Sequence, residues 1–163
     1  MNPNVFLYKE SEKNYVLYFG NYSTLESLAL IDANIKIEIT CFIATDIQDT
    51  VWISEKELPL LSTVGEVRTF LLGKDDIYSI INFEADFADI GSVSTHDDGE
   101  CQFSFFNKKT CLDILKMITP SQFSDLIIKE LLNNPDSYIT CSANGEIVKY
   151  RSFDEYLTDI GIL

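Results

Sequence analysis

The stretch Ile81-Asn-Phe-Glu-Ala-Asp-Phe87 decides the fold class, because apolar residues occupy every second position and polar residues lie between them. The same period of two runs through Ile35–Ile43, whose odd-numbered residues are all apolar, and through Cys101–Phe105. Such alternation is typical of β-strands that bury one face and expose the other. We therefore expect a sheet with one covered side and one polar side.

Further strands are expected on both sides of this centre. The shorter runs rich in β-branched and aromatic residues are Val5–Lys9, Tyr15–Phe19, Thr50–Ile53, Tyr138–Ser142 and Glu146–Arg151. Asn144-Gly145 separates the last two runs and favours a tight hairpin turn, because both residues tolerate positive φ. Between Phe87 and Cys101 the sequence predicts a glycine-containing loop.

Helix starts are indicated where a serine precedes a glutamate by three residues, since the two can cap each other's backbone. This pattern occurs in Ser23–Glu26, Ser54–Glu57 and Ser152–Glu155. Helices are also predicted at Thr110–Ile118 and Ser121–Leu132, whereas Val64–Leu72 fits a helix or a strand. We expect a single α+β domain over residues 1–163, with a mainly antiparallel sheet and about four short helices packed on one face.

The charge of the chain is strongly negative and unevenly distributed. There are 26 Asp+Glu and 12 Lys+Arg, so the net charge is −14, and the sequence pI is about 4.2. Residues 75–100 contain eight acidic residues and no Lys or Arg, so this segment alone contributes −8. Phosphate backbones and anionic membranes repel such a protein, so we expect no direct nucleic-acid partner and no membrane partner.

The acidic segment also holds large apolar residues, which predicts that its carboxylates are displayed on a rigid strand and the following loop. Glu84 and Asp86 share one strand face about 7 Å apart, where their repulsion would be relieved by cations from a partner. The partner-binding residues that we predict are Tyr78, Glu84, Asp86, Asp89, Asp97, Asp98, Glu100 and Trp52. Two alternatives stay open, namely a solvated face that aids solubility and a carboxylate metal site.

The two aromatic residues in this set can serve as interface anchors or as core residues. Trp52 is the only tryptophan of the chain and lies in the expected strand Thr50–Ile53. Tryptophan and tyrosine are common at the energetic centres of interfaces. The strand context favours a core position for Trp52, and Tyr78 is a similar case.

Signatures of catalysis and of metal binding are absent from the sequence. No nucleophile elbow, phosphate-binding loop or dinucleotide fingerprint occurs, and there is one histidine, His96. Pairing of His96 with Cys101 as a nucleophile is disfavoured, because Asp97 and Asp98 would raise the thiol pKa. We expect no enzymatic activity, no cofactor and no metal.

The cysteines are expected to be reduced thiols. Cys41, Cys101, Cys111 and Cys141 form no CxxC pair, and the N-terminus carries no secretion signal. Cys41 and Cys101 fall at apolar positions of their strands, where a thiol packs as a small hydrophobe. We therefore expect a cytoplasmic protein.

A small, acidic, cytoplasmic domain with a rigid acidic segment and no catalytic motif resembles bacterial toxin-immunity proteins, in particular those of contact-dependent growth inhibition and related toxin–antitoxin systems. The resemblance is one of type over the whole chain and rests on no motif. It implies a one-to-one complex with a basic toxin, with a nuclease domain as the expected class. The alternatives are a DNA-mimic anti-restriction protein and a metal-dependent hydrolase.

Overall fold

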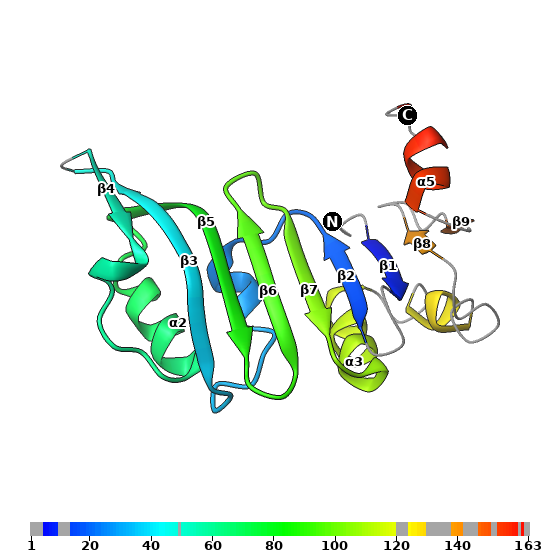
Figure 1. Ribbon diagram of the computed structural model, residues 1–163, viewed down its shortest axis with the longest axis horizontal. Helices are drawn as coiled ribbons and strands as arrows, with labels where there is room; N and C mark the ends of the chain where they lie inside the picture. The colour runs from blue at the N-terminus through cyan, green and yellow to red at the C-terminus, as the bar shows by residue number, and fades with distance from the viewer. Residues whose placement is uncertain are drawn as a thin grey trace. The chain divides into compact units, whose positions relative to one another are not determined.

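The computed structural model describes residues 5–9, 14–48, 50–119, 124–129, 138–141, 147–150, 153–159 and 161 (Figure 1). The chain divides into two compact units. One comprises Asn21–Phe103 and is called the central unit; the other comprises Met1–Gly20 and Ser104–Leu163 and is called the terminal unit.

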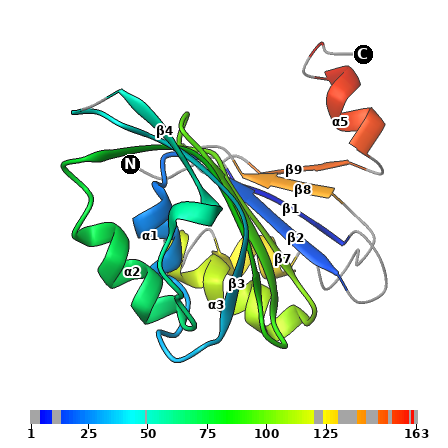
Figure 2. The same cartoon turned by 60° about the vertical axis from the view of Figure 1, so that its left-hand side comes forward.

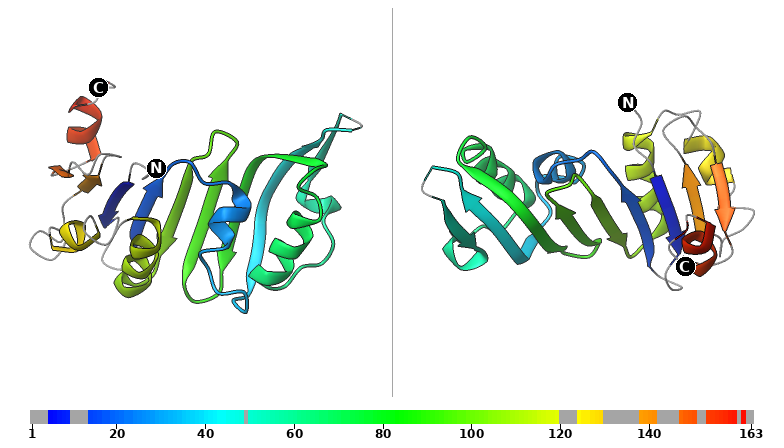
Figure 3. Two further views of the ribbon diagram at one scale, coloured as in Figure 1. Left: turned by 180° about the vertical axis from the view of Figure 1, so that it is seen from behind. Right: turned by 90° about the horizontal axis from the view of Figure 1, so that it is seen from above.

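The central unit is an antiparallel sheet with helices on one side. Its strands are β3 (Ile37–Asp46), β4 (Val51–Ser54), β5 (Tyr78–Phe87), β6 (Gly91–His96) and the first residues of β7 (Cys101–Phe105), in the order β4-β3-β5-β6-β7. Helices α1 (Thr24–Leu28) and α2 (Val64–Leu72) lie on the same side of this sheet (Figure 2; Figure 3, left), and the short 3-10 helix η1 (Glu55–Glu57) follows β4.

The core of the central unit lies between the sheet and these helices. Phe42 of β3 and Phe83 of β5 are fully buried and meet edge to face with 6.5 Å between ring centroids. Phe87 stacks on Phe103 at 6.3 Å. The alternation predicted for Ile81–Phe87 is confirmed at Phe83, Ala85 and Phe87, which are all buried.

The pattern expected for β3 is only partly correct. The pairing of β3 with β5 shifts register between Ile39 and Cys41, so that one residue is inserted and the alternation reverses. Phe42 and Ala44 therefore point into the core, and Ile43 is 39 % exposed on the opposite side. Cys41 was expected among buried apolar side chains; the structure places it half-buried on the helix-free side of the sheet.

Capping explains where the helices of the central unit begin. The Ser23 hydroxyl accepts from the Glu26 N–H and the Glu26 carboxylate accepts from the Ser23 N–H, so the predicted capping box is confirmed. Ser54 and Glu57 form a capping box at η1. The ambiguous segment Val64–Leu72 is helical, and its N-cap Thr63 accepts from the Glu66 N–H.

Strand β6 was not predicted, because the segment between Phe87 and Cys101 was expected to be a loop. Its residues Gly91–His96 include two serines and a glycine, which have low strand propensity. Pairing with β5 along its whole length overrides this preference and buries Val93 and Thr95. The acidic segment is therefore a hairpin with two strands rather than one strand followed by a loop.

The terminal unit is built in the same way. Strands β1 (Val5–Lys9), β2 (Tyr15–Phe19), β8 (Tyr138–Cys141) and β9 (Ile147–Tyr150) pair antiparallel in the order β2-β1-β8-β9. Its helices are α3 (Lys108–Ile118) and α5 (Phe153–Asp159), and residues 124–129 are also helical. Its fully buried side chains include Leu7, Leu17, Phe19, Leu115 and Ile127.

Most expectations for this unit are confirmed within the described residues. Helix α3 begins two residues earlier than predicted, because the Asn107 side chain accepts from the Thr110 N–H and caps it. The turn Asn144-Gly145, the cap Ser152 and the ends of the predicted helix Ser121–Leu132 lie outside the described residues. The α+β class with antiparallel strand pairing is confirmed.

Candidate partner-binding face

The side of the central sheet opposite α1 and α2 carries the candidate site and is called the outer face. Figure 1 looks onto it, and no described helix covers β3, β5 or β6 there. Residues directly opposite each other on antiparallel strands point to the same side. The register therefore places four rows on the outer face: Glu38, Asp86 and Ser92; Cys41, Glu84 and Ser94; Ser54, Ile43, Asn82 and His96; Trp52, Thr45 and Ser79.

Three carboxylates form an acidic cluster at one end of the outer face. Glu38 on β3 is directly opposite Asp86 on β5, so the Cβ atoms are about 5 Å apart. Glu84 lies two residues along β5 on the same side. The next residues on β6 are Ser92 and Ser94, and no described Lys or Arg lies within 4.0 Å of these three carboxylates. The predicted face of Glu84 and Asp86 is present, and Glu38 joins it.

Glu38 was missed at the sequence level, although a signal was available. It occupies a polar position of the alternating run Ile35–Ile43, which predicts that its side chain points away from the core. Its proximity to Asp86 depends on the pairing of two strands that are far apart in the chain, and no local pattern gives that register.

Exposed apolar side chains lie at the other end of the outer face. Trp52 is 65 % exposed, and Ile43 lies between Ser54 and Asn82 of the neighbouring strands. The preference for a core position of Trp52 was wrong, because β4 is the edge strand of the central unit and its residue Trp52 pairs with Thr45 on the outer face. Exposed tryptophan is enriched among interface anchors.

Cys41 lies beside the acidic cluster and remains a protonated thiol. Desolvation by burial raises its pKa, and the negative charges of Glu84 and Glu55 raise the pKa further. The Asn82 amide donates to its Sγ at 3.6 Å. A thiol with a raised pKa is a weak nucleophile, so Cys41 is not suited to nucleophilic chemistry.

Tyr78 does not belong to the outer face. Its ring lies 6.4 Å from that of Phe42 and 6.3 Å from that of Phe70, on the side of α2. The Lys74 ammonium is 5.7 Å from the centre of the Tyr78 ring, within the range of a cation–π contact. The structure therefore separates Tyr78 from Glu84 and Asp86 by the thickness of the sheet.

The remaining predicted acids lie in two turns at opposite ends of β6. Asp89 is exposed in the β5–β6 turn with a φ of 64°, whereas Asp97, Asp98 and Glu100 belong to the β6–β7 turn. Six strand residues separate these turns by about 20 Å. A partner bound at the centre of the outer face therefore need not contact both of these turns.

A small pocket of about 300 Å³ lies beside the β6–β7 turn. Tyr78, His96 and Asp97 line it together with Asp75 and residues 21–26. His96 is exposed, whereas Cys101 is fully buried, and burial raises the pKa of the Cys101 thiol to about 12. The sequence argument attributed a raised thiol pKa to Asp97 and Asp98, whereas in the structure its cause is burial.

Other site types find no support in the described residues. No cluster of three or more His, Cys, Asp or Glu suited to a metal ion occurs among them, and Cys41, Cys101 and Cys111 are free thiols. Within the same part of the chain, no helix combines the length and the apolar content needed to cross a membrane. Comparisons with protein families, curated proteins and solved structures found no match to this chain.

Proposed function

We propose that the protein is a cytoplasmic immunity or inhibitor protein that binds a basic toxin domain, with a nuclease as the expected class, and neutralises it in a one-to-one complex. The observation that carries the proposal is the acidic cluster of Glu38, Asp86 and Glu84 on the outer face, which lacks a nearby cation in the described chain. The sequence-level proposal placed the interface over residues 75–100; we now centre it on this cluster.

The arrangement of the cluster favours binding over solubility as its role. Like charges directly opposite each other on two strands destabilise a sheet, and a solvated face gains nothing from that placement. Arginine and lysine side chains from a partner would remove this repulsion and bind the carboxylates. The side chains are fixed on paired strands, so little conformational freedom is lost when the complex forms.

The exposed apolar side chains at the other end of the outer face would slow dissociation of the partner, which charge alone does not do. Carboxylates steer a basic partner and raise the association rate, whereas buried anchors set the dissociation rate. Trp52 and Ile43 are exposed on the same face as the acidic cluster. A nuclease toxin fits this pair of features, because its active cleft must be basic to bind a polyanion.

The test is binding of the purified chain to the purified product of the neighbouring gene, followed by stopped-flow at several salt concentrations. We expect E84K/D86K to lower the association rate constant about 10-fold or more at low ionic strength, with a smaller effect at 0.5 M salt. The matched control is D76K/D125K, which changes the net charge equally at two exposed acids outside the outer face. Its association rate constant should stay within about 2-fold of the unmodified protein.

Three outcomes contradict the proposal. The neighbouring product does not bind and is not neutralised in cells; or the two double variants lose association rate equally; or the rate does not depend on salt. An equal loss would show that only the total charge of the chain matters.

A further inference from the structure

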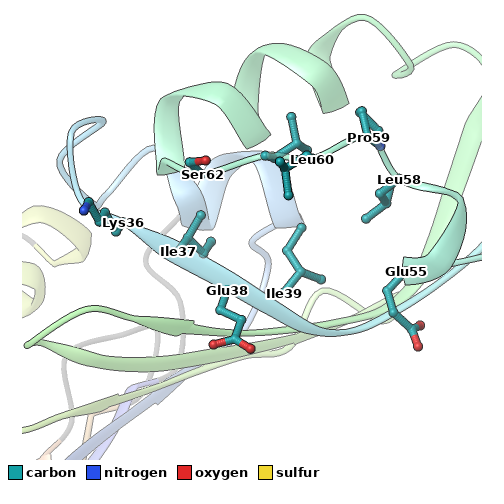
Figure 4. Close-up of a pocket in the computed structure, with 10 residues that line it drawn as sticks. Lys36, Ile37, Glu38, Ile39, Glu55, Leu58, Pro59, Leu60 and Ser62 are labelled. Atoms are coloured by element: carbon teal, nitrogen blue, oxygen red, sulfur yellow. The ribbon is translucent and has the colours of Figure 1, made fainter.

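A groove of about 600 Å³ opens beside β3 in the central unit (Figure 4). Ile37, Glu38 and Ile39 line one wall, and Leu58, Pro59 and Leu60 line the facing wall. Leu60 is 95 % exposed, so its side chain adds apolar surface to this wall. Most of the lining is apolar, with the acidic side chains of Glu38 and Glu55 at the rim and Lys36 and Ser62 at one end.

The groove exists because one edge of β3 lacks a partner strand along part of its length. Strand β4 pairs with residues 43–46 of β3, and the Ile37 N–H donates to the Ser62 carbonyl at 3.0 Å. Between these two places, no described strand pairs with residues 38–42 on the side away from β5. The unpaired length is about 17 Å, the span of five extended residues.

The segment that faces this edge cannot complete the sheet. The Leu58 N–H donates to the Glu55 carbonyl in the turn of η1, and Pro59 has no N–H. In a strand, neighbouring residues direct their N–H and C=O groups to opposite edges of the strand. Ile39 therefore directs these groups to the same edge as Ile37. The backbone of Ile39 is therefore presented to the groove.

We propose that this edge of β3 binds an extended, basic segment of a partner protein, which adds to the sheet as a further strand. Main-chain hydrogen bonds to Ile39 would provide affinity, and alternate side chains of the segment would contact Leu58 and Leu60. The inference rests on the proposed function in taking the partner to be basic.

Charge favours a basic segment over a second copy of this chain. Figure 4 shows the carboxylates of Glu38 and Glu55 directed to the same side, away from α2. Glu38 also belongs to the acidic cluster, so the groove and the outer face form one continuous surface. The central unit carries 16 acidic and 4 basic residues, so a second copy would meet strong repulsion.

The test uses a synthetic peptide and does not require the toxin. The probe is an acetylated and amidated hexapeptide of alternating lysine and valine, added up to about 1 mM, where weak specific contacts become populated. We expect NMR shift changes at residues 38–42. At a concentration about ten times the Kd, amide exchange at Ile39 should slow about 10-fold. The matched peptide, with glutamate in place of lysine, should bind at least about 10-fold more weakly.

Two leucine variants separate the groove from the rest of the surface. Leu60→Arg places a positive charge at the groove and should raise the Kd about 10-fold. Leu72→Arg makes the same change at the end of α2, where the leucine is 68 % exposed and does not line the groove, and should leave the Kd within about 2-fold.

The proposal is overturned if exchange at Ile39 is unchanged at 1 mM peptide, if both peptides bind equally, or if Leu60→Arg and Leu72→Arg behave alike. It is also overturned if sedimentation shows a dimer whose Ile39 amide is already protected without peptide, since the occupant is then a second copy. A peptide that binds while the toxin test fails leaves the edge as a peptide site and refutes the immunity function alone.

Discussion

The central and terminal units are similar in size and construction, but they differ in charge. Both are antiparallel sheets with short helices, and they contain 83 and 80 residues. The central unit has 16 acidic and 4 basic residues, so its net charge is −12. The terminal unit has 10 acidic and 8 basic residues, so its net charge is −2. Since one architecture accommodates both charge balances, the fold does not require the acidity of the central unit.

The two units also differ in how their charged side chains are placed. In the terminal unit, Lys109 and Asp113 form an ion pair at 2.7 Å one helical turn apart. In the central unit, Glu38 and Asp86 face each other across two strands. The first arrangement adds a little stability and the second subtracts a little. Folding stability therefore does not explain the placement of Glu38 and Asp86 in the central unit.

The largest expected effect tests how far the stability of the central unit depends on its aromatic core. Phe83→Ala removes a fully buried ring that contacts Phe42, and should lower the free energy of unfolding by about 3–5 kcal/mol in urea titrations. The control Phe106→Ala changes a ring of the terminal unit that is 54 % exposed, and should cost less than about 1 kcal/mol. Equal losses would contradict the placement of the core.

Alkaline titration compares one buried thiol in each unit. Burial raises the pKa of both Cys101 and Cys111 from 9.0 to about 12. The folded state therefore keeps protons that the unfolded chain releases, so stability is unaffected below pH 9 and falls between pH 9 and 12, by about 1.4 kcal/mol per pH unit per thiol.

Urea unfolding at pH 8, 9, 10 and 11 measures this slope. Cys101→Ala and Cys111→Ala should each remove about 1.4 kcal/mol per pH unit from the slope above pH 9. A slope that neither variant changes would show that the thiols are not buried as protonated groups.

The helix caps give a matched comparison between the two units, and the expected loss of stability is of intermediate size. Ser23→Ala in the central unit and Asn107→Ala in the terminal unit each remove an N-cap acceptor, and each should cost about 1 kcal/mol in thermal or urea unfolding. Asn107→Gly, which can still adopt the cap conformation, should cost only a few tenths of that. If Asn107→Gly costs as much as Asn107→Ala, the cap interaction is not the cause.

The smallest effect addresses the charge comparison directly. Glu38→Lys replaces a like-charge pair with an opposite-charge pair opposite Asp86, and should raise the free energy of unfolding by about 0.2–1 kcal/mol. Lys109→Gln removes the pair with Asp113 and should lower the free energy of unfolding by about 0.2–0.5 kcal/mol.

The control Asp76→Lys makes the same charge change as Glu38→Lys at an exposed loop acid. Equal gains from Glu38→Lys and Asp76→Lys would show a general effect of net charge rather than repulsion within the cluster. If the proposed function is correct, Glu38→Lys should stabilise the fold and weaken toxin binding.

The sequence by itself determined the features that depend on residues a few positions apart. Period-two alternation predicted β5, and Ser-x-x-Glu spacing predicted the caps of α1 and η1, because both signals are local. The acidic run of residues 75–100 was evident from composition alone. These signals were sufficient for the α+β class and for the location of most of the charge.

Only the tertiary structure decided which side chains meet. Strand β6 forms because β5 pairs with it, and the register shift in β3 brings Phe42 into the core and Cys41 out of it. Glu38 reaches Asp86, Trp52 becomes exposed, and Tyr78 turns away from the acidic cluster. Register and edge position arise from pairing between distant segments, and the spacing of residues within one segment does not contain them.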